Sequence, residues 1–358
     1  MKKIIILLFI ILFCTGCFNY VEINDLVLIN GIGIDYKDNK YIVSFETLQQ
    51  NKEHSDSNFE WGEVTVTNAD SISDAFNKLS LKLVKNPYYA HLKVIVISKE
   101  IASNHFSDLL DYFLRNNDIR NIFYLVVSDN ITPKELLNSK NKYYPTSSER
   151  IKELIENNEY NNFIVNNSYF KDIASNYLTK NKDIYLTMIG LEDNNMLINR
   201  MFIVGSNNKY LDINQSSILS ILTNSKPNIL IKHECEKDKY FTIKIYDSKS
   251  KYYINKSQFN IVSNLNAEIV ENNCNINLES NTEYNNITDI FNKKIDKEYK
   301  NLFDYLKEIN SDLIGINKKY FNKYRTRDYD YFKNSKYSVK TNIQLNKKGL
   351  IFEVKHND

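Results

Sequence analysis

Residues 92–98 read LKVIVIS and residues 122–128 read IFYLVVS, and these two short apolar runs decide the class of fold. Between them, apolar residues recur at the spacing of one helix face: Phe106, Leu109, Leu110, Phe113 and Leu114. A strand, a helix and a second strand in this order predict a βαβ unit with parallel strands and a right-handed crossover. The sequence therefore predicts an α/β-like region around these residues.

A hairpin is predicted before this unit. Residues 27–34 read VLINGIGI, and a polar run at 35–39 (DYKDN) separates them from the alternating residues Tyr41, Val43 and Phe45. Asp and Asn favour turns because their side chains hydrogen-bond to nearby backbone and tolerate left-handed conformations. Two alternating strands joined by such a turn are typical of a β-hairpin.

The rest of the first two thirds alternates helices with strands. The periodicity predicts helices over 72–83 (with Asp70 or Ser71 as N-cap), after Thr132-Pro133, over 148–160 and over 170–178, strands over 184–191 and 197–204, and a short helix capped near Asp212.

A break at Lys226-Pro227 separates this region from a different pattern. Strands are predicted over 229–232, 240–246, 259–270 and 337–345, a long helix over 287–313 that breaks at Gly315, and a turn over 346–349. The second region is therefore expected to be a long helix packed on a mainly antiparallel sheet. The whole chain is predicted to be a multi-domain α+β protein, with the α/β-like region first.

The N-terminus carries an export pattern. Lys2 and Lys3 precede an apolar run from 4 to 13, which is shorter than the ~20 residues that a spanning helix needs. This is typical of a secretory signal peptide. Thr15-Gly16-Cys17 resembles a bacterial lipobox, so we expect residues 1–16 to be removed and Cys17 to be lipidated. The alternative is an uncleaved, non-lipidated hydrophobic N-terminus.

Three segments follow from these boundaries. We predict a lipoprotein signal peptide at 1–16, an N-terminal region at 17–226 and a C-terminal domain at 227–358. The N-terminal region is expected to contain two subdomains that divide near 130–180.

The charge balance excludes two classes of partner. The chain has 46 Lys+Arg and 44 Asp+Glu, and removal of Lys2 and Lys3 leaves 44 of each sign. Nucleic-acid binders and polybasic membrane-surface proteins need an excess of positive charge. We expect neither.

No pattern of residues predicts catalysis, a cofactor or a metal. Gly31 and Gly33 begin a GxGxxG spacing, but Tyr36 stands at the third glycine and no helix follows. In His233-Glu234-Cys235 at most two side chains share a strand face, which is too few for a zinc site. Asp35 and Asp38 have the turn positions that Asp takes for backbone hydrogen bonding.

Two cysteines remain in the mature chain. Cys235 and Cys274 both lie in strand-like parts of the second region. An exported protein can form disulfides, but sequence spacing does not fix the distance between the two Cβ atoms. A disulfide and two buried free thiols both stay open.

Three stretches together resemble the Ger(x)C family, the lipoprotein C subunits of bacterial spore germinant receptors. They are Cys17 with 22–26 (EINDL) and 31–35 (GIGID), the block 91–97 (HLKVIVI) that continues through 109–117 to Ile119-Arg120, and 312–315 (DLIG) with the following residues to 347–351 (KKGLI). The resemblance implies a three-domain α+β ectodomain on the outer face of the spore inner membrane. It also implies two membrane-embedded partners, an A subunit and a permease-like B subunit.

Two functions compete at this point. The first is a non-catalytic subunit, anchored through Cys17, that scaffolds the A and B subunits, with no direct binding of nutrient. The alternative is an anchored lipoprotein that itself captures or delivers a small-molecule germinant. A capture protein of that kind would normally have two similar lobes, whereas this chain changes pattern near residue 227 and has no internal repeat.

Overall fold

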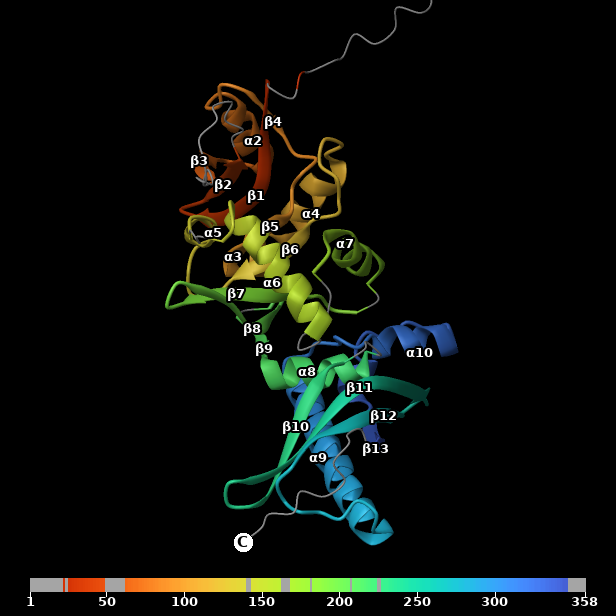
Figure 1. Ribbon diagram of the computed structural model, residues 1–358. Helices are drawn as coiled ribbons and strands as arrows, with labels where there is room; N and C mark the ends of the chain where they lie inside the picture. The colour runs from red at the N-terminus through yellow and green to blue at the C-terminus, as the bar shows by residue number, and fades with distance from the viewer. Residues whose placement is uncertain are drawn as a thin grey trace, which may run out of the picture.

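The computed structural model describes residues 22, 25–48, 62–139, 143–161, 168–180, 182–206, 208–223 and 227–346. Within these ranges the chain forms two sheets with their own helices, one above the other in Figure 1. The strands are β1 (Leu26–Lys37), β2 (Lys40–Leu48), β3 (Glu63–Ala69), β4 (Asn86–Tyr88), β5 (Val94–Ile97), β6 (Tyr124–Ser128), β7 (Tyr185–Glu192), β8 (Asn195–Ile203), β9 (Tyr210–Asp212), β10 (Ile229–Glu236), β11 (Lys239–Ile254), β12 (Gln258–Asn272) and β13 (Lys336–Asn346). The helices are α2 (Ile72–Ser80), α3 (Lys99–Asn104), α4 (Phe106–Arg115), α5 (Pro133–Leu137), α6 (Ser147–Asn161), α7 (Phe170–Thr179), α8 (Ile213–Leu222), α9 (Asn281–Glu308), α10 (Ile316–Tyr324) and α11 (Tyr331–Asn334).

The first sheet contains β1 to β9 in the order β3-β2-β1-β5-β6-β7-β8-β9, with β4 paired beside β1. Its centre is parallel, because β1 pairs with β5, β5 with β6 and β6 with β7 in the same direction. The predicted hairpin is confirmed as the antiparallel pair β1–β2, and its turn residues Asp38 and Asn39 have φ of 52° and 57°. The predicted βαβ unit is confirmed as β5, α3 with α4, and β6.

Helices cover both faces of the first sheet. Alternate residues of β5 and β6 point to opposite faces, so Ile95 and Ile97 join one apolar core and Val94 and Val96 join the other. Helices α2, α3, α4 and α7 complete the first core, and α5 and α6 complete the second. Thr132 and Asp212 cap α5 and α8 as the sequence predicts, and of the two candidates for α2, Asp70 and Ser71, the cap is Ser71.

Gly31 and Gly33 are explained by close packing of helices on β1. A Cβ atom at Gly31 would lie 2.9 Å from Cβ of Ser148 in α6, and one at Gly33 would lie 3.1 Å from Cβ of Pro133 in α5. Real Cβ atoms essentially never approach to less than 3.0 Å, and a contact of 3.1 Å is tighter than nine in ten real ones. Both helices therefore rest on a strand face without side chains, which is a structural role for the two glycines.

The second sheet has the order β10-β11-β12-β13. Its first three strands are antiparallel, and β13 pairs with β12 in parallel from Gln258↔Lys336 to Glu268↔Asn346. The long helix α9 connects these two parallel strands and packs on the sheet through Ile287, Phe291, Ile295, Leu302 and other residues. The prediction of a long helix on a mainly antiparallel sheet is confirmed. The helix ends at Glu308, so its predicted end at 313 is wrong, while Gly315, with φ of 78°, precedes the next helix α10 as predicted.

Cys235 and Cys274 form a disulfide, which decides between the two alternatives that the sequence leaves open. Their Cα atoms are 6.1 Å apart, within the range that a disulfide can bridge. The bond ties β10 to the segment that follows β12, at the edge of the second sheet.

The described residues form two sheets, where the resemblance implies three domains. Strands β7, β8 and β9 pair onto the edge of the first sheet, so they do not start a sheet of their own. The subdomain division near 130–180 and the boundary at 226/227 stay predictions. Within the described ranges, no helix is long and apolar enough to cross a bilayer.

The close packing at β1 generates a prediction about stability. We expect Gly31→Ala to lower the free energy of unfolding by about 1–3 kcal/mol, because the new methyl group overlaps α6 and forces the helix or the strand to move. Lys37→Ala, at an exposed position of the same strand, is the matched control and should change it by less than about 0.5 kcal/mol. Chemical denaturation followed by circular dichroism measures both values. Equal stability of the two variants would contradict this role of Gly31.

Candidate functional site at the joint between the two sheets

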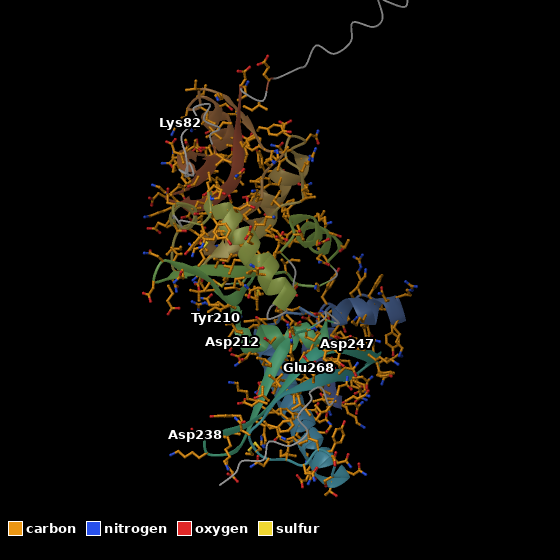
Figure 2. All side chains as sticks on the ribbon, in the orientation of Figure 1. Lys82, Tyr210, Asp212, Asp238, Asp247 and Glu268 are labelled. Carbon is orange, nitrogen blue, oxygen red and sulfur yellow. A yellow bond between two sulfur atoms is a disulfide. The ribbon has the colours of Figure 1, made fainter. Side chains whose placement is uncertain are left out.

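The two sheets are joined by a buried helix. Residues 216–222 of α8 are all buried, including the four apolar side chains Ile218, Leu219, Ile221 and Leu222. These side chains belong to the apolar core that α9 and the second sheet build, and Tyr185, Met201 and Ile203 of the first sheet belong to it too. Figure 2 shows Tyr210 and Asp212, just before α8, where the first sheet meets the second. One continuous core therefore extends across the boundary.

Both ends of α8 are held by side chains. At its N-terminus, the Asp212 carboxylate accepts a hydrogen bond from the backbone N–H of Gln215 at 2.7 Å, and the Gln215 side chain accepts one from the Asp212 N–H at 3.1 Å. This reciprocal arrangement is a capping box. Ser216 donates back to the Asp212 carbonyl at 2.7 Å, which uses its hydroxyl inside the buried helix.

At the C-terminus of α8, hydroxyl groups of β11 satisfy the last carbonyls. Ser248 and Ser250 both donate to the Ile221 carbonyl, at 3.1 and 3.2 Å, and Tyr252 donates to the Leu222 carbonyl. A buried helix end needs such partners because its last carbonyls have none within the helix. These hydroxyls come from the second sheet, so the cap also fastens α8 to it.

A second fastening joins Asp183, just before β7, to Asp312, just before α10. The Asp183 N–H donates to the Asp312 carbonyl at 3.0 Å, and the Asp312 N–H donates to the Asp183 carboxylate at 2.8 Å. The Ser311 hydroxyl donates to the same carboxylate at 3.0 Å. We refer to α8 together with Asp183 and Ser311–Asn317 as the joint.

The Asp312 carboxylate organises the start of α10. It accepts the backbone N–H groups of Gly315, Ile316 and Asn317 at 2.8, 2.9 and 2.7 Å. The residue is 6% exposed, and its burial raises the pKa of the carboxyl to about 6, since the hydrogen bonds to backbone N–H only partly offset the loss of water. The negative charge of Asp183 nearby raises this pKa further.

A cavity of about 650 Å³ lies beside the Asp183–Asp312 contact. Its walls come from the α3–α4 turn, the end of α7, the start of β7 and the segment from Asn310 to Lys333. Ligand sites of small molecules commonly have 300–1,000 Å³, so the size of this cavity fits that class. Charged and aromatic side chains line it, among them Tyr177, Lys180, Lys182, Tyr329, Asp330 and Lys333.

Lys182 is a partly buried cation in the wall of the cavity. Its burial lowers the pKa of the ammonium group, while the negative charge of Asp312 acts in the opposite direction. The ammonium lies 5.5 Å from the ring centre of Tyr185, which supplies a cation–π contact. On the side of the first sheet, Lys180, Lys182 and Asp183 line the cavity together.

Two further buried carboxylates hold the fold together. Asp129, at the end of β6, lies 2.8 Å from the Lys99 ammonium and accepts the Arg200 Nε–H at 2.7 Å. Burial alone would raise the pKa of Asp129, but hydrogen bonds from Lys99, Arg200 and Asn199 hold it below its usual range. Glu46 of β2 accepts the N–H groups of Ser147 and Ser148 at the start of α6, and burial raises its pKa. Both carboxylates already have partners that explain their positions.

The residues considered from the sequence do not come together as a reactive site. Cys235 is used in the disulfide, and the described part of the chain contains no group of three or more side chains that could hold a metal ion. Asp38 lies in the hairpin turn as predicted, whereas Asp35, also expected in the turn, lies in β1, because the strand continues to Lys37. Cys17 and the signal segment 1–16 lie outside the described residues, so lipidation stays a prediction.

Sequence reasoning missed the joint itself. In the sequence, Asp312 stands out only as part of the DLIG block, and nothing in the spacing connects it with Asp183. The one available signal is Gly315, because an Asp three residues before a helix-starting glycine can accept the N–H groups of the new helix.

Comparison with known proteins places this architecture in the class of spore germination proteins. Residues 19–191 match the family model described as spore germination protein N-terminal domain, and residues 203–349 match the one described as spore germination B3/GerAC like, C-terminal. The crystal structure of the GerBC protein has the same fold, with a TM-score of 0.57 and 17% identity over 88% of this chain and 96% of that chain. The protein belongs to the Ger(x)C family, the C subunits of spore germination receptors.

Similar curated proteins come from Bacillus subtilis (strain 168). Spore germination protein B3 is 27% identical over 169 residues, which is 46% of this chain and 45% of B3. Spore germination protein A3 is 28% identical over 170 residues, which is 44% of this chain and 43% of A3. Spore germination protein KC is 25% identical over 134 residues, which is 35% of this chain and 32% of KC. The matches thus span less than half the length of these relatives.

The raised pKa of Asp312 generates a prediction about pH. The pKa of this carboxyl is about 3.9 in the unfolded chain and about 6 in the folded protein. Between these values the folded state holds a proton that the unfolded state has lost, so stability falls as the pH rises through this window. The Asn side chain of Asp312→Asn does not titrate. As the pH rises through this window, the free energy of unfolding of the natural protein should fall relative to that of Asp312→Asn by up to about 1.4 kcal/mol per pH unit.

Urea denaturation at several pH values across this window measures the difference. Asp118→Asn, at an exposed position, is the control and should keep the pH dependence of the natural protein. An identical pH dependence in the natural protein and in Asp312→Asn would show that Asp312 does not titrate in this way.

Proposed function

We propose that this protein is a non-catalytic, lipid-anchored subunit of a nutrient germinant receptor. It is held on the outer face of the spore inner membrane through Cys17, and it scaffolds the membrane-embedded A and B subunits. Family membership supports the role in germination, and the Thr15-Gly16-Cys17 pattern supports the anchor. Acyl chains on Cys17 would confine the protein to the membrane plane and raise its effective concentration near its partners.

The joint is the observation that carries the scaffolding role. A scaffold must present its surfaces in a fixed relative position, and here α8 is buried in a core shared by both sheets. The β11 hydroxyls at the C-terminus of α8 and the reciprocal Asp183–Asp312 contact add hydrogen bonds across the boundary. A separation of the sheets would expose the apolar side chains of α8, at a cost of about 1.5–3 kcal/mol for each large one.

The cavity beside the joint favours a second candidate, the capture of a small germinant. Its volume of about 650 Å³ and its place between the two sheets are typical of ligand sites. Lys182 on one wall and Asp330 on the other offer charges of both signs.

Titration calorimetry of the purified protein with amino acids, sugars and nucleosides separates the two candidates. If the protein is a scaffold, none of these compounds should give saturable heat. A saturable signal at millimolar affinity or tighter that disappears in Lys182→Met, but persists in Lys237→Met, would favour capture. Lys237 is the matched control because it is exposed in the β10–β11 turn, away from the cavity.

The anchor generates a separate prediction. Cys17→Ala should abolish the incorporation of labelled lipid and move the protein from the membrane fraction of spores to the soluble fraction, with reduced germination. Cys14→Ala is the matched control and should keep all three properties, because the residues before Cys14 (Leu12 and Phe13) are not small. Incorporation of lipid into Cys17→Ala at the natural level would refute the assignment of this residue.

A further inference from the structure

The turn between α2 and β4 exposes apolar side chains to an unusual degree. Leu81 is 87% exposed and Val84 is 103% exposed, the two highest values among the large apolar side chains of the described residues. Isolated exposed apolar residues are common on protein surfaces, but here two lie within four residues of each other. We refer to Leu81–Lys85 as the α2–β4 turn.

The conformation of this turn is fixed by the core beneath it. The N–H groups of Lys82 and Leu83 both donate to the Leu79 carbonyl, at 2.8 and 3.1 Å. Leu83 turns inward and packs against the core of the first sheet, and its neighbours on either side point to solvent. Leu81 and Val84 are therefore held outward by a structured turn.

Lysines flank the two apolar side chains in the sequence. Lys82 and Lys85 lie within the turn and are exposed, and residues 75–99 contain no Asp or Glu. The Lys82 ammonium donates to the Val66 carbonyl at 2.6 Å, a contact that leaves its positive charge in place. Exposed apolar residues among lysines match the chemistry of an anionic bilayer surface, where apolar groups enter the acyl boundary and ammonium groups meet phosphates.

The position of the turn is tied to the start of β1. Strand β4, which follows the turn directly, pairs with β1 so that Asn86 lies beside Leu26. Leu26 lies nine positions after Cys17, and a chain of this length extends at most ~30 Å. The turn therefore lies at the end of the molecule that an acyl anchor at Cys17 would hold near the membrane. Figure 2 shows Lys82 at this end and Asp238 at the opposite end.

We propose that the α2–β4 turn docks on the anionic surface of the bilayer. Leu81 and Val84 enter the headgroup region, and Lys82 and Lys85 contact lipid phosphates. The inference rests on the proposed anchor, because acyl chains at Cys17 keep the turn close enough to the membrane for a weak contact to form. The docking also orients the protein, with the first sheet toward the membrane and the second sheet away from it.

Depth-dependent fluorescence quenching tests the docking directly. The full chain, lipidated at Cys17, carries an environment-sensitive fluorophore at Val84→Cys, or at Asn286→Cys as the control. Asn286 is exposed on the first turns of α9, which Figure 1 places at the opposite end of the molecule. The protein is reconstituted in vesicles of phosphatidylcholine with phosphatidylglycerol, or of phosphatidylcholine alone, with spin-labelled lipid as quencher.

We expect a blue shift and quenching at position 84, and neither at position 286. Lys82→Gln with Lys85→Gln should abolish the quenching at position 84, and Lys82→Arg with Lys85→Arg should retain it, because arginine keeps the charge. Phosphatidylcholine alone should give less quenching than the anionic mixture. All these positions are exposed, so the substitutions leave the core of the protein intact.

Flotation of the vesicles keeps this inference separate from the anchor. Protein that floats with the vesicles but shows no quenching at position 84 overturns the docking and leaves the anchor standing. A signal at position 84 that arises only when the B subunit is reconstituted as well also overturns it, in favour of a protein contact. If the natural protein does not float at all, the anchor and the docking are both refuted.

Discussion

The burial of α8 between the two sheets is the constraint on which the rest of the structure depends. A helix whose last seven residues are all buried has no solvent at its C-terminus, so every carbonyl there needs a partner from the protein. For the last two carbonyls, those of Ile221 and Leu222, the hydroxyls of Ser248, Ser250 and Tyr252 meet this need from a single strand. Strand β11 must therefore pass the C-terminal end of α8. Its pairing with β10 and β12 then fixes the position of the second sheet relative to the first.

Local patterns in the sequence predict most of the elements. The hairpin, the βαβ unit and the long helix each follow from a periodicity that is complete within one segment, and the N-caps follow from a single residue type at a boundary. Ser71, Thr132 and Asp212 are examples, since each accepts a hydrogen bond from the N–H three residues later. These features depend on residues that are close in the sequence, so the sequence alone is enough to predict them.

Contacts between distant segments could not be predicted in the same way. The sequence excludes a nucleotide-binding loop at Gly31 and Gly33, but their packing role becomes visible only with the positions of α5 and α6. The parallel pairing of β13 with β12 depends on the path of α9, and the Cys235–Cys274 bond depends on a Cα distance that spacing does not contain. Asp183 and Asp312 are 129 positions apart, and only the folded chain brings them together.

The shared core also limits how the protein can respond to a partner. A hinge between the sheets would break the Asp183–Asp312 contact and expose Ile218, Leu219, Ile221 and Leu222, and these four side chains together contribute several kcal/mol at about 1.5–3 kcal/mol each. A ligand or partner can shift such an equilibrium only by its own difference in affinity between the closed and open states. Weak contacts of one or two residues do not reach this amount. Opening a hinge between the two sheets therefore costs more free energy than such contacts supply.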